Sequence, residues 1–111
     1  MKKTTPEGEV KMEVIEYLRK KGHWVLPHPT TAIYDSRIGQ YRAFNENSGT
    51  RGEPDLLVFS KTSPISPIWL ELKAKKGRVS PDQILFFDKA KAWGHEVSVI
   101  RSVDDCIALG L

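Results

Sequence analysis

The alternation of apolar and polar residues predicts a helix near the start of the chain. Between residues 7 and 21, apolar side chains recur at spacings of three and four, which is typical of a helix with one apolar face. The recurring residues are Val10, Val14, Ile15, Tyr17 and Leu18. Thr5 suits the N-cap of this helix and Pro6 its first position. Gly22 suits its C-terminal end.

Short apolar runs predict four strands. They cover residues 23–27, 56–59, 68–74 and 97–100, and their lengths are typical of strands. Pro54 lacks an N–H group and suits the first residue of the second strand, so Asp55 is held on a stiff base.

A second helix is predicted over residues 81–93. Ser80 suits its N-cap, Pro81 its first position, and Gln83 the third position of a capping box. The expected buried positions of this helix are Ile84, Phe87, Ala90 and Trp93. A short last helix follows Ser102. This order of elements predicts an α/β fold with a mixed central β-sheet flanked by α-helices.

Residues 28–51 show weak periodicity and many polar side chains. We expect a long loop here, and a loop of this length in a small domain is uncommon and often functional. Its arginines, tyrosines and amides suit contacts to phosphate and sugar. A solvated excursion with no contacts of this kind is the alternative.

Composition narrows the class of protein. The chain has 111 residues, of which 40% are hydrophobic and 28% charged, and we expect a single globular domain over residues 1–111. There is no apolar run long enough for a membrane span, and the basic start lacks the apolar core of a secretory signal. The single cysteine, Cys106, is expected to be buried, and a reducing cytoplasm fits this cysteine usage.

The net charge of +3 permits binding to nucleic acid without establishing it. The distribution of the charge is more informative than its total. Basic residues precede Asp55 and follow Glu71 in two clusters, which are Arg37, Arg42 and Arg51, and then Lys73, Lys75, Lys76 and Arg78. Both clusters flank the two carboxylates. Apart from Lys73, we expect these residues to contact the phosphates of a nucleic acid.

Two of the predicted strands carry the candidate chemistry. Because side chains alternate along a strand, Glu71 and Lys73 point to one face and their leucine neighbours to the other. If the two strands pair, Asp55 approaches Glu71. Two carboxylates that converge beside a lysine form a site for a hard divalent cation and a polarised water. Such a site suits hydrolysis of a phosphodiester.

In this hypothesis Asp55, Glu71 and the backbone carbonyl of Leu72 hold the cation. Lys73 orients the water or stabilises charge in the transition state. Glu7 and Glu9 lie in the first turn of the first helix, where the helix dipole favours anions. One of them would complete the acidic cluster, and Glu9 is preferred. The alternative is a solvated cross-strand face, but charges on a strand that helices should cover favour a functional cleft.

Three segments together carry a resemblance to a known family. They are Gly52-Glu53-Pro54-Asp55, Glu71-Leu72-Lys73 and Gly77-Arg78-Val79-Ser80-Pro81-Asp82-Gln83. At this spacing they resemble the VRR-NUC family of the PD-(D/E)XK nuclease superfamily. The resemblance covers most of the chain, including the first helix with its early glutamates.

The resemblance implies a restriction-endonuclease-like core and cleavage of DNA phosphodiesters that depends on Mg²⁺ or Mn²⁺. Asp55 and Glu71 match the metal ligands of the family, and Lys73 matches its catalytic lysine. Gln83 matches a polar residue that faces the site, in addition to its place in the capping box. Glu7 and Glu9 both fit the helix carboxylate, and Glu9 is preferred.

Minimal standalone members of the family, such as those of phages, resemble Holliday-junction resolvases that work as homodimers. This implies structure-selective cleavage of branched DNA in the cytoplasm of a bacterial or phage-infected cell. A twofold dimer would supply the two sites that a four-way junction requires, and some of the aromatic residues would lie at its interface. Two alternatives remain open: a nuclease of the same fold acting on flap or duplex DNA, and a catalytically silent nucleic-acid-binding module.

Overall fold

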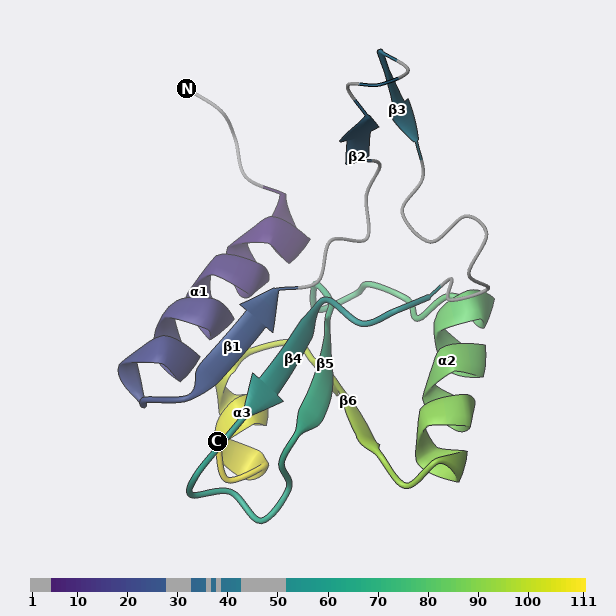
Figure 1. The fold of residues 1–111 in the computed structure, drawn as a ribbon. Coiled ribbons are helices and arrows are strands. Elements are labelled where there is room, and N and C mark those ends of the chain that lie inside the picture. The colour runs from purple at the N-terminus through teal and green to yellow at the C-terminus, as the bar shows by residue number, and fades with distance from the viewer. Residues whose placement is uncertain (1–4, 28–32, 36, 38, 43–51) are drawn as a thin grey trace.

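The computed structural model describes residues 5–27, 33–35, 37, 39–42 and 52–111. Within these ranges the helices are α1 (Pro6–Lys20), α2 (Pro81–Ala92) and α3 (Val103–Ala108). The strands are β1 (Trp24–Pro27), β2 (Ile33–Asp35), β3 (Gln40–Arg42), β4 (Leu56–Phe59), β5 (Ile68–Leu72) and β6 (Glu96–Ile100). Figure 1 shows these helices beside the central sheet and the β2–β3 pair apart from it.

The central sheet has the strand order β1-β4-β5-β6. β4 is antiparallel to both β1 and β5, whereas β5 and β6 run parallel. The sheet is therefore mixed, which confirms the predicted α/β class with a restriction-endonuclease-like core. β5, which carries Glu71, is a central strand because it is hydrogen-bonded on both sides.

One face of the sheet forms the hydrophobic core. Its fully buried residues on β4 and β5 are Leu56, Val58, Ile68, Leu70 and Leu72. Val14 and Leu18 of α1 and Cys106 of α3 pack against them. Cys106 is buried as expected, and this burial raises the pKa of its thiol to about 11. The core thus holds the ends of β4 and β5 rigidly against α1.

α2 lies over the opposite face, where Phe86 meets Trp69 of β5 edge to face. Its expected buried positions were wrong at Ile84, which is 49% exposed, and at Trp93, which is 75% exposed. The partly buried positions are instead Gln83, Phe86, Phe87 and Ala90, which repeat at helical spacing. The partly buried face of α2 begins with the polar Gln83 because Glu71 lies on the sheet opposite it. A search for apolar residues alone therefore places this face at the wrong positions of the helix.

The long segment between β1 and β4 contains structure that was not expected. β2 and β3 form an antiparallel pair in which Tyr34 lies opposite Tyr41. Gly39 takes a positive φ of 66° just before β3, a conformation that glycine adopts without strain. Residues 28–32, 36, 38 and 43–51 lie outside the described part of the chain. No helix in the described part has the length and apolar character needed to cross a membrane.

Candidate active site

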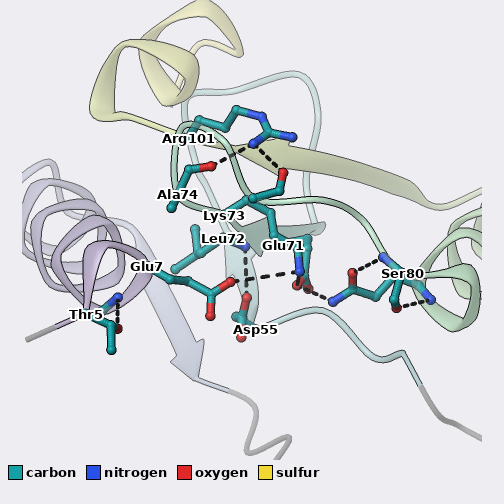
Figure 2. A network of polar contacts seen from close by, with 12 residues as sticks. Thr5, Glu7, Asp55, Glu71, Leu72, Lys73, Ala74, Ser80 and Arg101 are labelled. Atoms are coloured by element: carbon teal, nitrogen blue, oxygen red, sulfur yellow. Dashed lines mark hydrogen bonds and ion pairs between the residues drawn. The ribbon is translucent and has the colours of Figure 1, made fainter.

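Asp55 lies directly before β4 and is held from both sides. Pro54 before it is fully buried. The side-chain Oδ2 accepts a 2.8 Å hydrogen bond from the backbone N–H of Leu72, at the end of β5. The antiparallel register pairs Leu56 with Leu70, so the next pair along brings Asp55 opposite Glu71. The two carboxylates therefore converge as the sequence predicted (Figure 2).

Glu71 is a buried carboxylate, only 3% exposed. Its Oε1 accepts a 2.6 Å hydrogen bond from Gln83 Nε2 and lies 3.6 Å from Lys73 Nζ. Its Oε2 is buried and has no hydrogen-bond partner among the described residues. Burial and, next, the charge of Asp55 raise the pKa of Glu71 to about 8, against the opposing effect of Lys73. The site thus holds a carboxyl group whose ionised form requires further positive charge.

Lys73 places its ammonium between two carboxylates. Lys73 Nζ lies 3.6 Å from Glu71 Oε1 and 3.9 Å from Glu7 Oε1, and its side chain is only 12% exposed. The backbone N–H of Lys73 donates to the carbonyl oxygen of Ile100 at 3.0 Å. This bond extends the β5–β6 pairing by one residue and holds the lysine in the sheet.

Of the two candidate helix glutamates, Glu7 makes the contact with Lys73. Residues two apart on a helix are separated by about 200° around its axis, so Glu9 lies on a different side of α1 from Glu7. Both glutamates are exposed. The sequence led us to prefer Glu9, but the contact of Glu7 with Lys73 favours Glu7 as the helix carboxylate of the site.

Gln83 performs two functions with different atoms. Its Oε1 accepts from the backbone N–H of Ser80 at 2.8 Å, and Ser80 Oγ accepts from the Gln83 N–H at 3.2 Å. These two bonds form the predicted capping box. The amide nitrogen Nε2 donates to Glu71. The start of α2 is thus tied directly to the carboxylates of the sheet (Figure 2).

Gly52 lets the segment before Asp55 approach α2 closely. Its φ is +84°, and a Cβ added there would lie 2.3 Å from the carbonyl oxygen of Asp82. Both the backbone conformation and the contact therefore require glycine. The approach brings the chain leading into Asp55 against the first turn of α2, next to Gln83.

The arrangement agrees with a comparison against protein-family models, in which the model of the VRR-NUC domain matches residues 25–104. The chain belongs to the VRR-NUC family. The matched range includes Asp55, Glu71, Lys73 and Gln83, whereas α1 with Glu7 lies outside it. Separate searches of curated proteins and of solved structures found no significant match.

Membership of the VRR-NUC family implies a nuclease of the PD-(D/E)XK type, with DNA as its substrate. Nucleases of this type usually use divalent metals. The described residues contain no group of three or more His, Cys, Asp or Glu side chains arranged to hold a metal ion. Among the described residues, a metal site would therefore need oxygen atoms in addition to these side chains, from backbone carbonyl groups and water.

The oxygen atoms present fit such a site. The N–H of Leu72 points toward Asp55. The N–H and C=O of one residue in an extended strand point to the same side. The carbonyl oxygen of Leu72 therefore also points toward the side where Asp55 lies. Together with the unpartnered Oε2 of Glu71, this gives a set of hard oxygen donors. Mg²⁺ is commonly held by one or two carboxylates and keeps several waters. This donor set therefore fits a small divalent cation.

The predicted DNA contacts fall into two groups. Lys75, Lys76 and Arg78 are exposed in the segment that follows Lys73. Arg37 is exposed between β2 and β3. Arg42 belongs to β3, but its side chain lies outside the described part of the structure, as does the whole of Arg51.

Sequence reasoning missed Arg101, which follows β6. Arg101 Nη1 donates hydrogen bonds to the carbonyl oxygens of Ala74 and Gly77 at 2.7 and 2.8 Å. These residues lie just after Lys73, so Arg101 supports the end of the catalytic strand (Figure 2). No local motif points to this role, because the contact joins segments more than twenty residues apart.

Proposed function

We propose that this VRR-NUC protein is an endonuclease that hydrolyses DNA phosphodiesters with Mg²⁺ or Mn²⁺, acts selectively on branched DNA such as four-way junctions, and works as a homodimer. One observation carries the metal-dependent chemistry. Glu71 is buried beside Asp55 with an oxygen that lacks a hydrogen-bond partner among the described residues. A buried carboxylate without full compensation is costly, and a bound cation would provide that compensation.

Each residue of the site would have a distinct role in catalysis. Asp55, Glu71 and the carbonyl of Leu72 would hold the ion, with Glu7 as an additional carboxylate at the edge. The bound ion would neutralise charge on the scissile phosphate and make a water more acidic. Gln83 would keep Glu71 oriented through its amide. Lys73 would orient the attacking water or stabilise the charge that develops on the phosphate.

Basic residues close to the site would contact the DNA backbone. Lys75, Lys76 and Arg78 are exposed directly after Lys73, and Arg37, Arg42 and Arg51 are the candidates from the segment before β4. Lysine and arginine contacts to phosphate carry affinity with little sequence preference. Such binding is appropriate for an enzyme that selects the shape of DNA, and it should weaken as salt concentration rises.

An uncovered apolar part of the sheet supports the homodimer. On the face opposite the core, Trp24 of β1 is 61% exposed and stacks on Phe59 of β4 with ring centroids 4.8 Å apart. Leu26, on the same face, is also exposed. An exposed tryptophan beside other apolar residues is typical of protein interfaces. A second copy on this face would pair two active sites by twofold symmetry, as cleavage of a four-way junction requires.

A panel of labelled substrates tests the proposal. Four-way junction, flap and linear duplex are each incubated with the protein in Mg²⁺, in Mn²⁺ and in EDTA. We expect cleavage of the junction that depends on the metal and exceeds cleavage of the duplex. Equal cleavage of the duplex would exclude junction selectivity, and binding without cleavage of any substrate would favour a silent binding module. Sedimentation of the free protein tests the homodimer, which a monomer at micromolar concentration would contradict.

A further inference from the structure

The turn that follows β5 is held by one guanidinium group. Arg101 Nη1 donates hydrogen bonds to the carbonyl oxygens of Ala74 at 2.7 Å, Gly77 at 2.8 Å and Lys75 at 3.2 Å. The turn also closes on itself, since the N–H of Gly77 donates to the carbonyl of Ala74 at 2.9 Å. A single cation thus gathers three carbonyl dipoles of one turn, and hydrogen bonds from a charged donor are among the strong ones.

Arg101 is itself fixed by the helix that follows it. Its backbone N–H donates to Asp105 Oδ2 of α3 at 2.8 Å. The residue before it, Ile100, accepts the backbone hydrogen bond of Lys73. The segment that contains Ile100 and Arg101 therefore positions both Lys73 and the turn after it.

The turn presents its cations outward. Lys75 and Lys76 are exposed, whereas the carbonyl oxygens of Ala74, Lys75 and Gly77 accept hydrogen bonds from Arg101. The turn is closely packed, because a Cβ added at Gly77 would lie 3.3 Å from backbone atoms of Ala74. Groups held in place before binding lose less freedom when they bind. A fixed turn would therefore offer its two lysines to phosphates at a lower entropic cost than a flexible one.

We propose that Arg101 is a positioning residue for substrate: without contacting DNA, it fixes the 74–77 turn so that Lys75 and Lys76 meet the DNA backbone beside Lys73. The proposal rests on the nuclease function proposed above, because it takes DNA as the ligand of the turn. It assigns Arg101 to binding of substrate and leaves the chemical step to the carboxylates and Lys73.

Limited digestion with trypsin tests whether Arg101 holds the turn. Arg101→Met removes the donors and keeps the length of the side chain, and Arg101→Lys keeps the charge. We expect digestion after Lys75 and Lys76 to accelerate about tenfold in Arg101→Met, because local opening exposes the turn, and by less in Arg101→Lys. Unchanged digestion at these sites would overturn the proposal.

A double-mutant cycle tests whether the turn acts on DNA. DNA affinity is measured in EDTA, where no cleavage occurs. Arg101→Met should weaken binding by about fivefold in the wild type but by less than about twofold in a Lys75→Ala/Lys76→Ala background. In a Lys61→Ala/Lys91→Ala background, which removes two exposed charges elsewhere, the full effect should remain.

Equal effects of Arg101→Met in both backgrounds would overturn the proposal. If Arg101→Met does not melt cooperatively, Arg101→Lys is measured in the same cycle and decides the outcome, with a smaller expected effect.

With an active enzyme, Arg101→Met should raise KM about fivefold and leave kcat within about twofold. A fall in kcat with KM unchanged would contradict a role in positioning substrate. A wild type that binds DNA but never cleaves it would overturn the nuclease function alone, because the cycle in EDTA does not depend on cleavage.

Discussion

Gln83 Nε2 donates a 2.6 Å hydrogen bond to Glu71 Oε1, which joins the first turn of α2 to the central strand β5. The amide oxygen of Gln83 is already used by the N–H of Ser80 in the capping box. Since an amide group has one oxygen acceptor and one nitrogen donor, the cap determines which atom faces Glu71. The local signal that begins α2 thus also orients a donor toward the buried carboxylate.

Changes at Gln83 and Ser80 should separate these two functions. Gln83→Glu keeps an oxygen for the cap but replaces the donor to Glu71 with a second carboxylate. We expect it to lower the rate of cleavage about tenfold or more. Ser80→Ala removes the cap and keeps the donor, so it should cost about 1 kcal/mol of stability and leave the cleavage rate nearly unchanged. Melting curves and single-turnover rates measure both effects, and the opposite pattern would show that Gln83 is only a cap.

Glu7 and Glu9 form a matched pair for a second test. Both lie in the first turn of α1, so Glu7→Gln and Glu9→Gln remove the same charge from the same helix end. Glu7 makes the contact with Lys73 described above. We expect Glu7→Gln to slow cleavage by about threefold to tenfold and Glu9→Gln by less than about twofold. A larger loss in Glu9→Gln would return the helix carboxylate to Glu9.

The raised pKa of Glu71 predicts how the stability of the metal-free protein depends on pH. The folded protein keeps the Glu71 proton up to about pH 8, whereas the ordinary value is 4.5. Between these values the native state binds more protons than the unfolded state, so the Glu71 contribution to stability falls as pH rises from about 4.5 to about 8. Asp55 and Glu7 add to the effect, and Lys73 opposes it.

Glu71→Gln, which stays neutral, should therefore gain stability relative to the wild type across this range. In EDTA, its Tm relative to wild type should rise by on the order of 5 °C between about pH 5 and about pH 9. Glu16→Gln, which alters an exposed ion pair with Lys20, is the control and should show little change. Parallel curves for Glu71→Gln and wild type would contradict the raised pKa.

Gly52→Ala tests the close approach of the segment before Asp55 to α2. The substitution places a Cβ against the Asp82 carbonyl at a positive φ, and we expect a loss of roughly 2–4 kcal/mol in the free energy of unfolding. Gly22→Ala is the matched control, because Gly22 also has a positive φ, of +87°, but no atom within 4 Å of the added Cβ. Equal losses in denaturant titrations would show that backbone strain alone is responsible.

Local signals predicted the helix starts well. Thr5 with Pro6, and Ser80 with Pro81 and Gln83, cap α1 and α2 as expected, because capping depends on residues adjacent in the sequence. The β2–β3 pair was missed because each strand has only three residues. Such short strands leave too little alternation to detect.

The candidate site was predicted in part. Asp55, Glu71 and Lys73 followed from strand alternation, but the choice between Glu7 and Glu9 depends on how α1 rotates against the sheet. The sequence did contain a signal that favours Glu7, which precedes the buried Val14 by seven residues. This spacing places both residues on nearly the same side of a helix. Arg101 had no such signal, because its contacts with the 74–77 turn form only in the folded chain.

We propose that Asp55 and Glu71 hold a divalent cation for cleavage of DNA. The most direct test of this proposal is the single-turnover cleavage rate of a four-way junction in Mg²⁺, at saturating protein, for wild type, Asp55→Asn and Glu71→Gln. Asp55→Asn retains an oxygen that can accept from the Leu72 N–H, so the strand contact can survive. We predict that both variants lose at least about 100-fold in rate while their affinity for DNA in EDTA stays within about threefold of wild type. Rates equal to wild type in either variant would contradict the assigned site.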